Sequence, residues 1–129
     1  MYKSFLAIKW LLYKLKLLQS PRKGITLLQK PEKIFLENTN LLYAFAPTGL
    51  DIGMVRETFA LNQIKVVHKV NYPDKAGDIL VDEQFIFEIG GKSKKQSRSA
   101  DLENYFIIAD DWDFKVGNKI PIWLLGLLY

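Results

Sequence analysis

The run Tyr-Phe-Ile-Ile-Ala at residues 105–109 restricts the fold more than any other feature of this chain, because it is continuously apolar. A strand with apolar residues on both sides is typical of a sheet that helices cover. We therefore expect an α/β fold with a central mixed sheet of four or five strands flanked by helices. A length of 129 residues with 49% hydrophobic side chains suits a chain with one sizeable core.

Residue types that are missing exclude several kinds of site. The chain has no Cys and a single His, His68. These counts exclude disulfides, a thiolate zinc site, a Cys nucleophile and a His-rich metal centre. They also fit a reducing compartment. Four lysines interrupt the apolar residues 1–18, so neither a membrane span nor a signal peptide is expected there. We expect a cytoplasmic protein with no membrane association.

Apolar spacing and turn residues predict the order of the elements. Residues 38–40, Asn-Thr-Asn, offer caps for one helix, and Asp51 is placed as the N-cap of another. The expected elements are a helix from residue 4 that leads into strand 15–19, a short apolar segment at 25–29, strand 33–37, a helix holding residues 41–45, helix 52–63, strands 65–70, 78–81 and 85–89, a short helix over 100–104, strand 105–109, and a helix that starts at Pro121.

The tight turn at residues 82–84 allows the register of one hairpin to be predicted. With Glu83 at its centre, Asp78 lies opposite Glu88 and Leu80 lies opposite Ile86. Opposed residues have Cβ atoms about 4.5 to 5.5 Å apart, close enough for two carboxylates to share one Mg²⁺. The alternative is that Asp78 is a turn residue and Glu88 lies on a solvated face.

Four stretches give the chain a family resemblance: KPEKIFLENTNLLYAF (31–46), IGMVRETFALNQ (52–63), GDILVDEQFIFEIGGKSK (77–94) and GNKIPIWLLGLLY (117–129). Together they resemble the C-terminal region of bacterial AAA-type ATPases that carry a PD-(D/E)XK nuclease-like domain of unknown function. The resemblance implies a winged-helix-like remnant at residues 1–46 and a nuclease-like domain with a restriction-endonuclease-like core at 47–129. It also implies that Glu57 on a helix, with Asp78 and Glu88, holds Mg²⁺ or Mn²⁺ for phosphodiester hydrolysis.

The chain departs from the nuclease pattern at one position. The pattern has a lysine two residues after the second acid, and this chain has Gly90 there. We expect Lys92 to take that catalytic role beside Asp78 and Glu88, and the basic segment around it to contact nucleic-acid phosphates through Lys92, Lys94, Lys95 and Arg98. The alternative is a catalytically inert module that docks onto an ATPase domain or another protein, or a truncated remnant of such an ATPase.

ATP binding is not expected. Gly90, Gly91, Lys92 and Ser93 resemble the end of a phosphate-binding loop, but the pattern needs Gly at position 86, which is Ile. Because the ATPase module is missing, the expectation is either a domain fragment of a larger protein or a separate protein that has lost its motor. The choice between DNA and RNA and the oligomeric state stay open.

Overall fold

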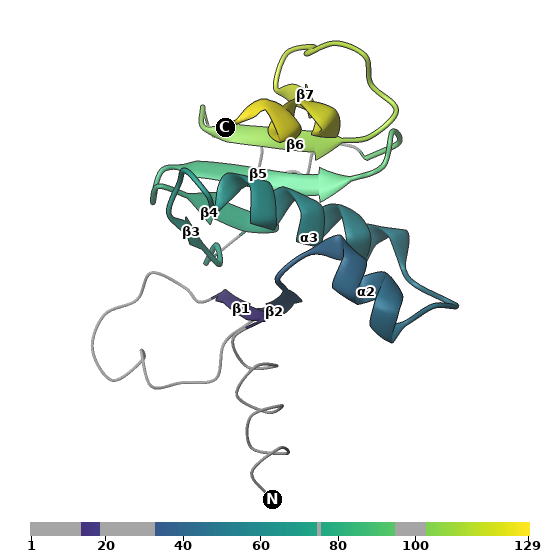
Figure 1. Ribbon diagram of the computed structural model, residues 1–129. Helices are drawn as coiled ribbons and strands as arrows, with labels where there is room; N and C mark the ends of the chain where they lie inside the picture. The colour runs from purple at the N-terminus through teal and green to yellow at the C-terminus, as the bar shows by residue number, and fades with distance from the viewer. Residues whose placement is uncertain (1–13, 19–32, 75, 95–102) are drawn as a thin grey trace, which may run out of the picture.

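The centre of the molecule is a five-stranded mixed sheet (Figure 1). The computed structural model describes residues 14–18, 33–74, 76–94 and 103–129. In the sheet order the strands are β3 (Val70–Asn71), β4 (Ile79–Val81), β5 (Phe85–Gly90), β6 (Tyr105–Ala109) and β7 (Lys119–Pro121). The first three strands are antiparallel neighbours, β6 runs parallel to β5, and β7 runs parallel to β6. The predicted α/β class and mixed sheet are confirmed.

Side-chain caps set the starts of the two α-helices. Helix α2 spans Thr39–Phe45, and the side chain of Asn38 accepts a hydrogen bond from the Leu41 N–H at 3.0 Å. Helix α3 spans Ile52–Ile64, and the side chain of Asp51 accepts from the Gly53 N–H at 3.0 Å. Such caps bind N–H groups that have no partner within the helix. The cap predicted at Asp51 is confirmed, and Asn38 is the cap among the three candidate residues 38–40.

A separate two-stranded antiparallel sheet pairs β1 (Leu15–Leu18) with β2 (Lys33–Leu36). Leu18 and Phe35 belong to the same buried cluster as Leu61 of α3 and Ile108 of β6. The segments on the two sides of residue 46 therefore share one hydrophobic core. Because Lys33 alternates with the exposed Ile34, it lies on the same side of β2 as the buried Phe35.

Strand β6 is covered on both faces, as its apolar sequence predicts. Ile108 packs into the larger cluster, which also takes residues from α3 and from the 3₁₀ helix η2 (Ile122–Leu127). Tyr105, Ile107 and Ala109 form a second cluster with Ile86 and Trp112. Alternate residues of β6 thus enter different clusters, and the prediction of a strand buried on both sides is confirmed.

One predicted strand is wrong over most of its length. Residues 65–69 continue from the C-terminus of α3 as turns, because the N–H groups of Val67 and His68 both donate to the Ile64 carbonyl at 3.2 and 2.9 Å. Only Val70 and Asn71 enter the sheet. The helix predicted to start at Pro121 is present as the 3₁₀ helix η2, which begins one residue later because Pro121 ends β7, a strand that the sequence pattern did not predict.

Some predicted elements lie outside the described residues. These are the first helix, the apolar segment 25–29 and most of helix 100–104. Among the helices described, none is both long and apolar enough to cross a membrane.

Candidate functional site

The β4–β5 hairpin has the predicted register. Leu80 pairs with Ile86, Ile79 with Phe87 and Val81 with Phe85. Asp82 and Glu83 in the connecting turn have positive φ angles of 51° and 59°, which let the chain reverse within three residues. Asp78 and Glu88 lie at the same end of the hairpin, but the pairing stops at Ile79 and Phe87, so the predicted pairing of Asp78 with Glu88 is not formed.

Beyond Ile79, the side chain of Asp78 makes a hydrogen bond to β5 that a backbone carbonyl would make in a regular strand pair. The backbone N–H of Asp78 donates to the Phe87 carbonyl at 2.8 Å, although Phe87 is already the partner of Ile79. The side chain Oδ2 then accepts from the Ile89 N–H at 2.8 Å. The second carboxylate oxygen of Asp78 is directed away from β5, toward Lys33.

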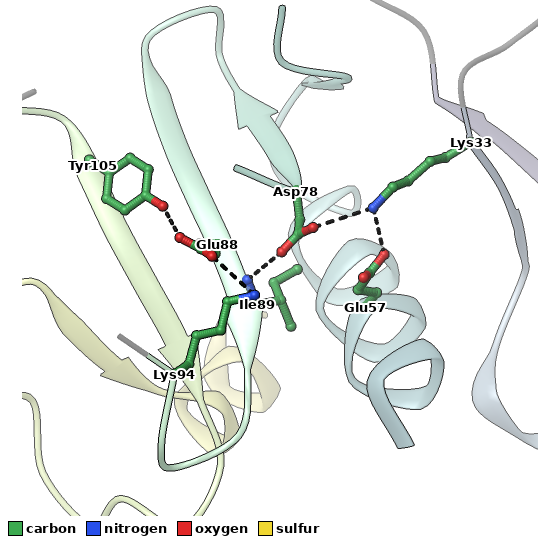
Figure 2. Close-up of polar contacts among 7 residues, drawn as sticks. All are labelled: Lys33, Glu57, Asp78, Glu88, Ile89, Lys94 and Tyr105. Atoms are coloured by element: carbon green, nitrogen blue, oxygen red, sulfur yellow. Dashed lines mark hydrogen bonds and ion pairs between the residues drawn. The ribbon is translucent and has the colours of Figure 1, made fainter. Parts of the chain in front are cut away.

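Lys33 of β2 joins two carboxylates from different elements (Figure 2). Its Nζ lies 2.9 Å from Oε2 of Glu57 on α3 and 3.3 Å from Oδ1 of Asp78. The side chains of Lys33, Glu57 and Asp78 are 30%, 26% and 19% exposed. The ammonium group is therefore the cation that offsets the charges of both carboxylates.

Burial and charge act on Lys33 in opposite directions. Desolvation lowers its pKa, but the hydrogen bonds to Glu57 and Asp78 and their negative charges together outweigh it, so the pKa lies above the ordinary value of 10.5. A raised pKa in the folded state means that the stability from this contact is complete below pH 10.5. It is lost as the pH rises through the pKa of the folded protein.

Glu88 has a different set of partners. Its Oε2 accepts a hydrogen bond from the hydroxyl of Tyr105, and its Oε1 lies 3.0 Å from Lys94 Nζ. The Glu88 side chain is only 14% exposed, and Tyr105 is buried in the second cluster. Asp78 and Glu88 are neighbours in the hairpin, yet each is held by its own lysine and its own hydrogen-bond donor.

The lysine that reaches these carboxylates is Lys94 and not Lys92. A turn in which the Lys94 N–H donates to the Gly91 carbonyl at 2.9 Å folds the chain back over β5. A Cβ at Gly90 would lie 2.6 Å from Lys94 Cδ, so the missing side chain leaves the room that Lys94 occupies. Lys92 is exposed, and no contact joins it to Asp78 or Glu88 among the described residues.

The other predicted phosphate contacts divide between the described and undescribed parts of the chain. Lys94 is engaged with Glu88, and Lys92 is exposed. Lys95 and Arg98 lie outside the described residues. Next to the site, Arg56 Nε lies 2.6 Å from Asp110 Oδ2. This ion pair joins α3 to the residue that follows β6.

The carboxylates have the right chemistry for Mg²⁺ or Mn²⁺, but their arrangement does not fit a divalent cation. Both oxygens of Asp78 and both oxygens of Glu88 already have a donor. In the part of the chain that the structure describes, no three His, Cys, Asp or Glu side chains lie close enough together to hold a metal ion. Lysine ammonium groups supply the positive charge that a metal would otherwise supply.

Two of these functional contacts were not predicted from the sequence. Lys33 had a usable signal: it shares a face of β2 with the buried Phe35, and an inward-facing lysine needs a carboxylate partner. Tyr105 had none, because its hydroxyl meets Glu88 only through the parallel pairing of β5 with β6.

Comparison of the chain with protein-family models, with curated proteins and with solved structures finds no match.

Proposed function

We propose that this chain is a nuclease-like, nucleic-acid-facing domain, related to the C-terminal part of AAA-type ATPases, that binds the phosphodiester backbone without cleaving it. Three features of the resemblance support the proposal. Glu57 lies on a helix that precedes the hairpin, Asp78 and Glu88 lie at one end of that hairpin, and a lysine reaches the second acid.

The observation that supports binding without cleavage is that each of the three carboxylates is paired with a lysine. Lys33 holds Glu57 and Asp78, and Lys94 holds Glu88. A hydrolytic metal needs carboxylate oxygens that are available as ligands, and it activates a bound water. Oxygens that are already bonded to ammonium groups do not provide such a site, so we assign the surface to binding alone.

The basic residues after β5 supply the binding surface in this proposal. Lys92 is exposed just beyond the carboxylates, and the chain as a whole carries a formal charge of +4. Lysines that contact phosphates release counterions, which makes the affinity fall as salt rises. The same segment continues into Lys95 and Arg98 in the sequence.

Fluorescence anisotropy with labelled DNA and RNA tests this function. We expect binding that weakens with salt, and a Lys92→Ala variant whose slope of log affinity against log salt is smaller by about 1. Lys69→Ala is the matched control, because Lys69 is also exposed but pairs with Glu83 at the turn end of the hairpin. Equal slopes for the wild type and Lys92→Ala would contradict the assignment of phosphate binding to the residues after β5.

A cleavage assay on the same nucleic acids tests the other half of the proposal. With Mg²⁺ or Mn²⁺ we expect no product above the level seen with EDTA. Cleavage that needs the metal and disappears in Glu88→Ala would overturn the non-cleaving function and favour Mg²⁺-dependent hydrolysis.

A second candidate is a module that docks onto an ATPase domain or another protein. Large apolar side chains at the C-terminal end support it: Trp123, Leu127 and Tyr129 are 53%, 72% and 71% exposed. The two candidates differ in the anisotropy assay, where the docking module shows no salt-dependent binding of nucleic acid.

A further inference from the structure

Lys33 occupies an unusual position for a lysine on a strand. Its Nζ is a single point within 3.3 Å of two carboxylate oxygens, one from α3 and one from the residue before β4. Without this ammonium group, Glu57 and Asp78 would lose the cation that they share, and among the described residues no other lysine or arginine forms an ion pair with either. Two adjacent carboxylates attract a cation of some kind, and the protein supplies its own.

We infer that Lys33 is a built-in substitute for a divalent cation, so that docking of its ammonium group between Glu57 and Asp78 and binding of Mg²⁺ or Mn²⁺ there exclude each other. The inference rests on the proposed function in one respect: it explains what keeps this nuclease-like site from cleaving. It predicts that removal of the Lys33 side chain turns the two carboxylates into a metal site.

The distances make this exchange feasible. Mg²⁺ binds oxygen at about 2.0 to 2.1 Å and is usually held by one or two carboxylates together with several waters. The oxygens of Glu57 and Asp78 lie 2.9 and 3.3 Å from the lysine nitrogen. Each oxygen therefore has to move about 1 Å toward a metal at that point, which is a small movement for carboxylate side chains.

The space beside Lys33 fits a hydrated ion. Lys33 and Glu57 line a cavity of about 530 Å³ between β2, α2 and α3. A water molecule takes about 30 Å³, so four metal-bound waters need about 120 Å³. The cavity can hold these waters and also gives the ion a path to Glu57.

Tethering makes Lys33 an effective competitor. The pairing of β2 with β1 and the burial of Phe35 fix the backbone beside the carboxylates, so the ammonium group is always near them. A metal binds only to the fraction of molecules in which the lysine has left, and its apparent affinity is reduced by that fraction. Rotation of the Lys33 side chain is sufficient for release, because the rest of β2 keeps its contacts.

Titration of the wild type and Lys33→Met with Mn²⁺, followed by the electron paramagnetic resonance signal of free Mn²⁺, tests the inference. We expect Lys33→Met to bind one Mn²⁺ at least tenfold more tightly than the wild type, and Lys33→Met/Asp78→Asn to lose that gain. Lys33→Arg keeps the positive charge and is expected to behave as the wild type. Lys94→Met is the matched control, because Lys94 offsets one carboxylate only and its removal creates no two-carboxylate site.

Lys33→Gln is a second neutral variant that keeps the test decisive if the methionine variant does not fold. Equal Mn²⁺ affinity in the wild type and in a folded neutral variant would overturn the inference. This result, if binding is weak in both proteins, leaves the non-cleaving nucleic-acid function in place. Tight Mn²⁺ binding by the wild type with metal-dependent cleavage would instead overturn the proposed function.

Discussion

Lys33→Met should lower the free energy of unfolding by about 2 kcal/mol at pH 7. Methionine keeps much of the apolar stem, so the main loss is the charge between Glu57 and Asp78. Removing one member of a fully buried pair costs about 3 to 5 kcal/mol, whereas exposed pairs contribute about 0 to 1 kcal/mol. These side chains are 19% to 30% exposed, which places the expected loss between the two ranges. Urea denaturation of both proteins measures it.

The control for this prediction is Lys69→Met. Lys69 and its partner Glu83 are 64% and 55% exposed, so the change should stay within about 0.5 kcal/mol. The difference between the wild type and Lys33→Met should also shrink above pH 10.5, as Lys33 loses its proton. A Lys33→Met protein as stable as the wild type at pH 7 would show that the ammonium group does not offset the carboxylates.

Gly77→Ala should lower the free energy of unfolding by about 3 kcal/mol. Gly77 has a φ of +87°, a conformation that side chains with a Cβ rarely adopt. An added Cβ would also lie 2.5 Å from Ile86 Cγ2 and 3.1 Å from the Phe87 carbonyl oxygen. Both atoms belong to β5, so relief of the contact has to move the strand or the turn that carries Asp78.

Gly49→Ala separates the two causes of this loss. Gly49 also has a positive φ, of +73°, but an added Cβ there would meet nothing within 4 Å. The control should therefore lose only the backbone contribution, about 1 to 2 kcal/mol. Thermal denaturation of the two variants measures the difference. A Gly77→Ala protein no less stable than Gly49→Ala would contradict the close packing of this turn against β5.

The parts of the fold that the sequence predicts are those that depend on local patterns. Asn38 and Asp51 cap helices because their side chains bond to N–H groups two or three residues away. The short turn at Glu83 fixes the register that follows from it, including the pairing of Leu80 with Ile86. The apolar run at β6 predicts burial on both faces without any knowledge of its neighbours.

The wrong strand at residues 65–69 shows how a local pattern misleads. Val66, Val67 and Val70 favour a strand, but residues 65–68 are better satisfied by hydrogen bonds back to the last turn of α3. Val66 and Val67 are exposed as a result. The competition between these two pairings depends on where α3 ends, which apolar alternation does not specify.

In the candidate site, too, local features were predictable from the sequence and long-range contacts were not. The register of the hairpin was predictable, but its pairing ends at Ile79 and Phe87, so the predicted placement of Asp78 directly opposite Glu88 is wrong. The choice of Lys94 over Lys92 depends on a turn at Gly91 and on the space above Gly90. The meeting of Lys33 with Glu57 and Asp78 depends on how β2 packs against α3, across 24 and 45 residues of chain. Such long-range contacts have no local sequence pattern.

A double-mutant cycle between Lys33 and Asp78 tests the central claim most directly. Urea denaturation of the wild type, Lys33→Met, Asp78→Asn and the double variant gives the coupling free energy, and asparagine keeps an oxygen that accepts from the Ile89 N–H. We predict a coupling above about 1 kcal/mol, because the second change removes a carboxylate that the first left without its cation. Effects that add to within about 0.3 kcal/mol would contradict the account, since Lys33 would then not be the cation of this site.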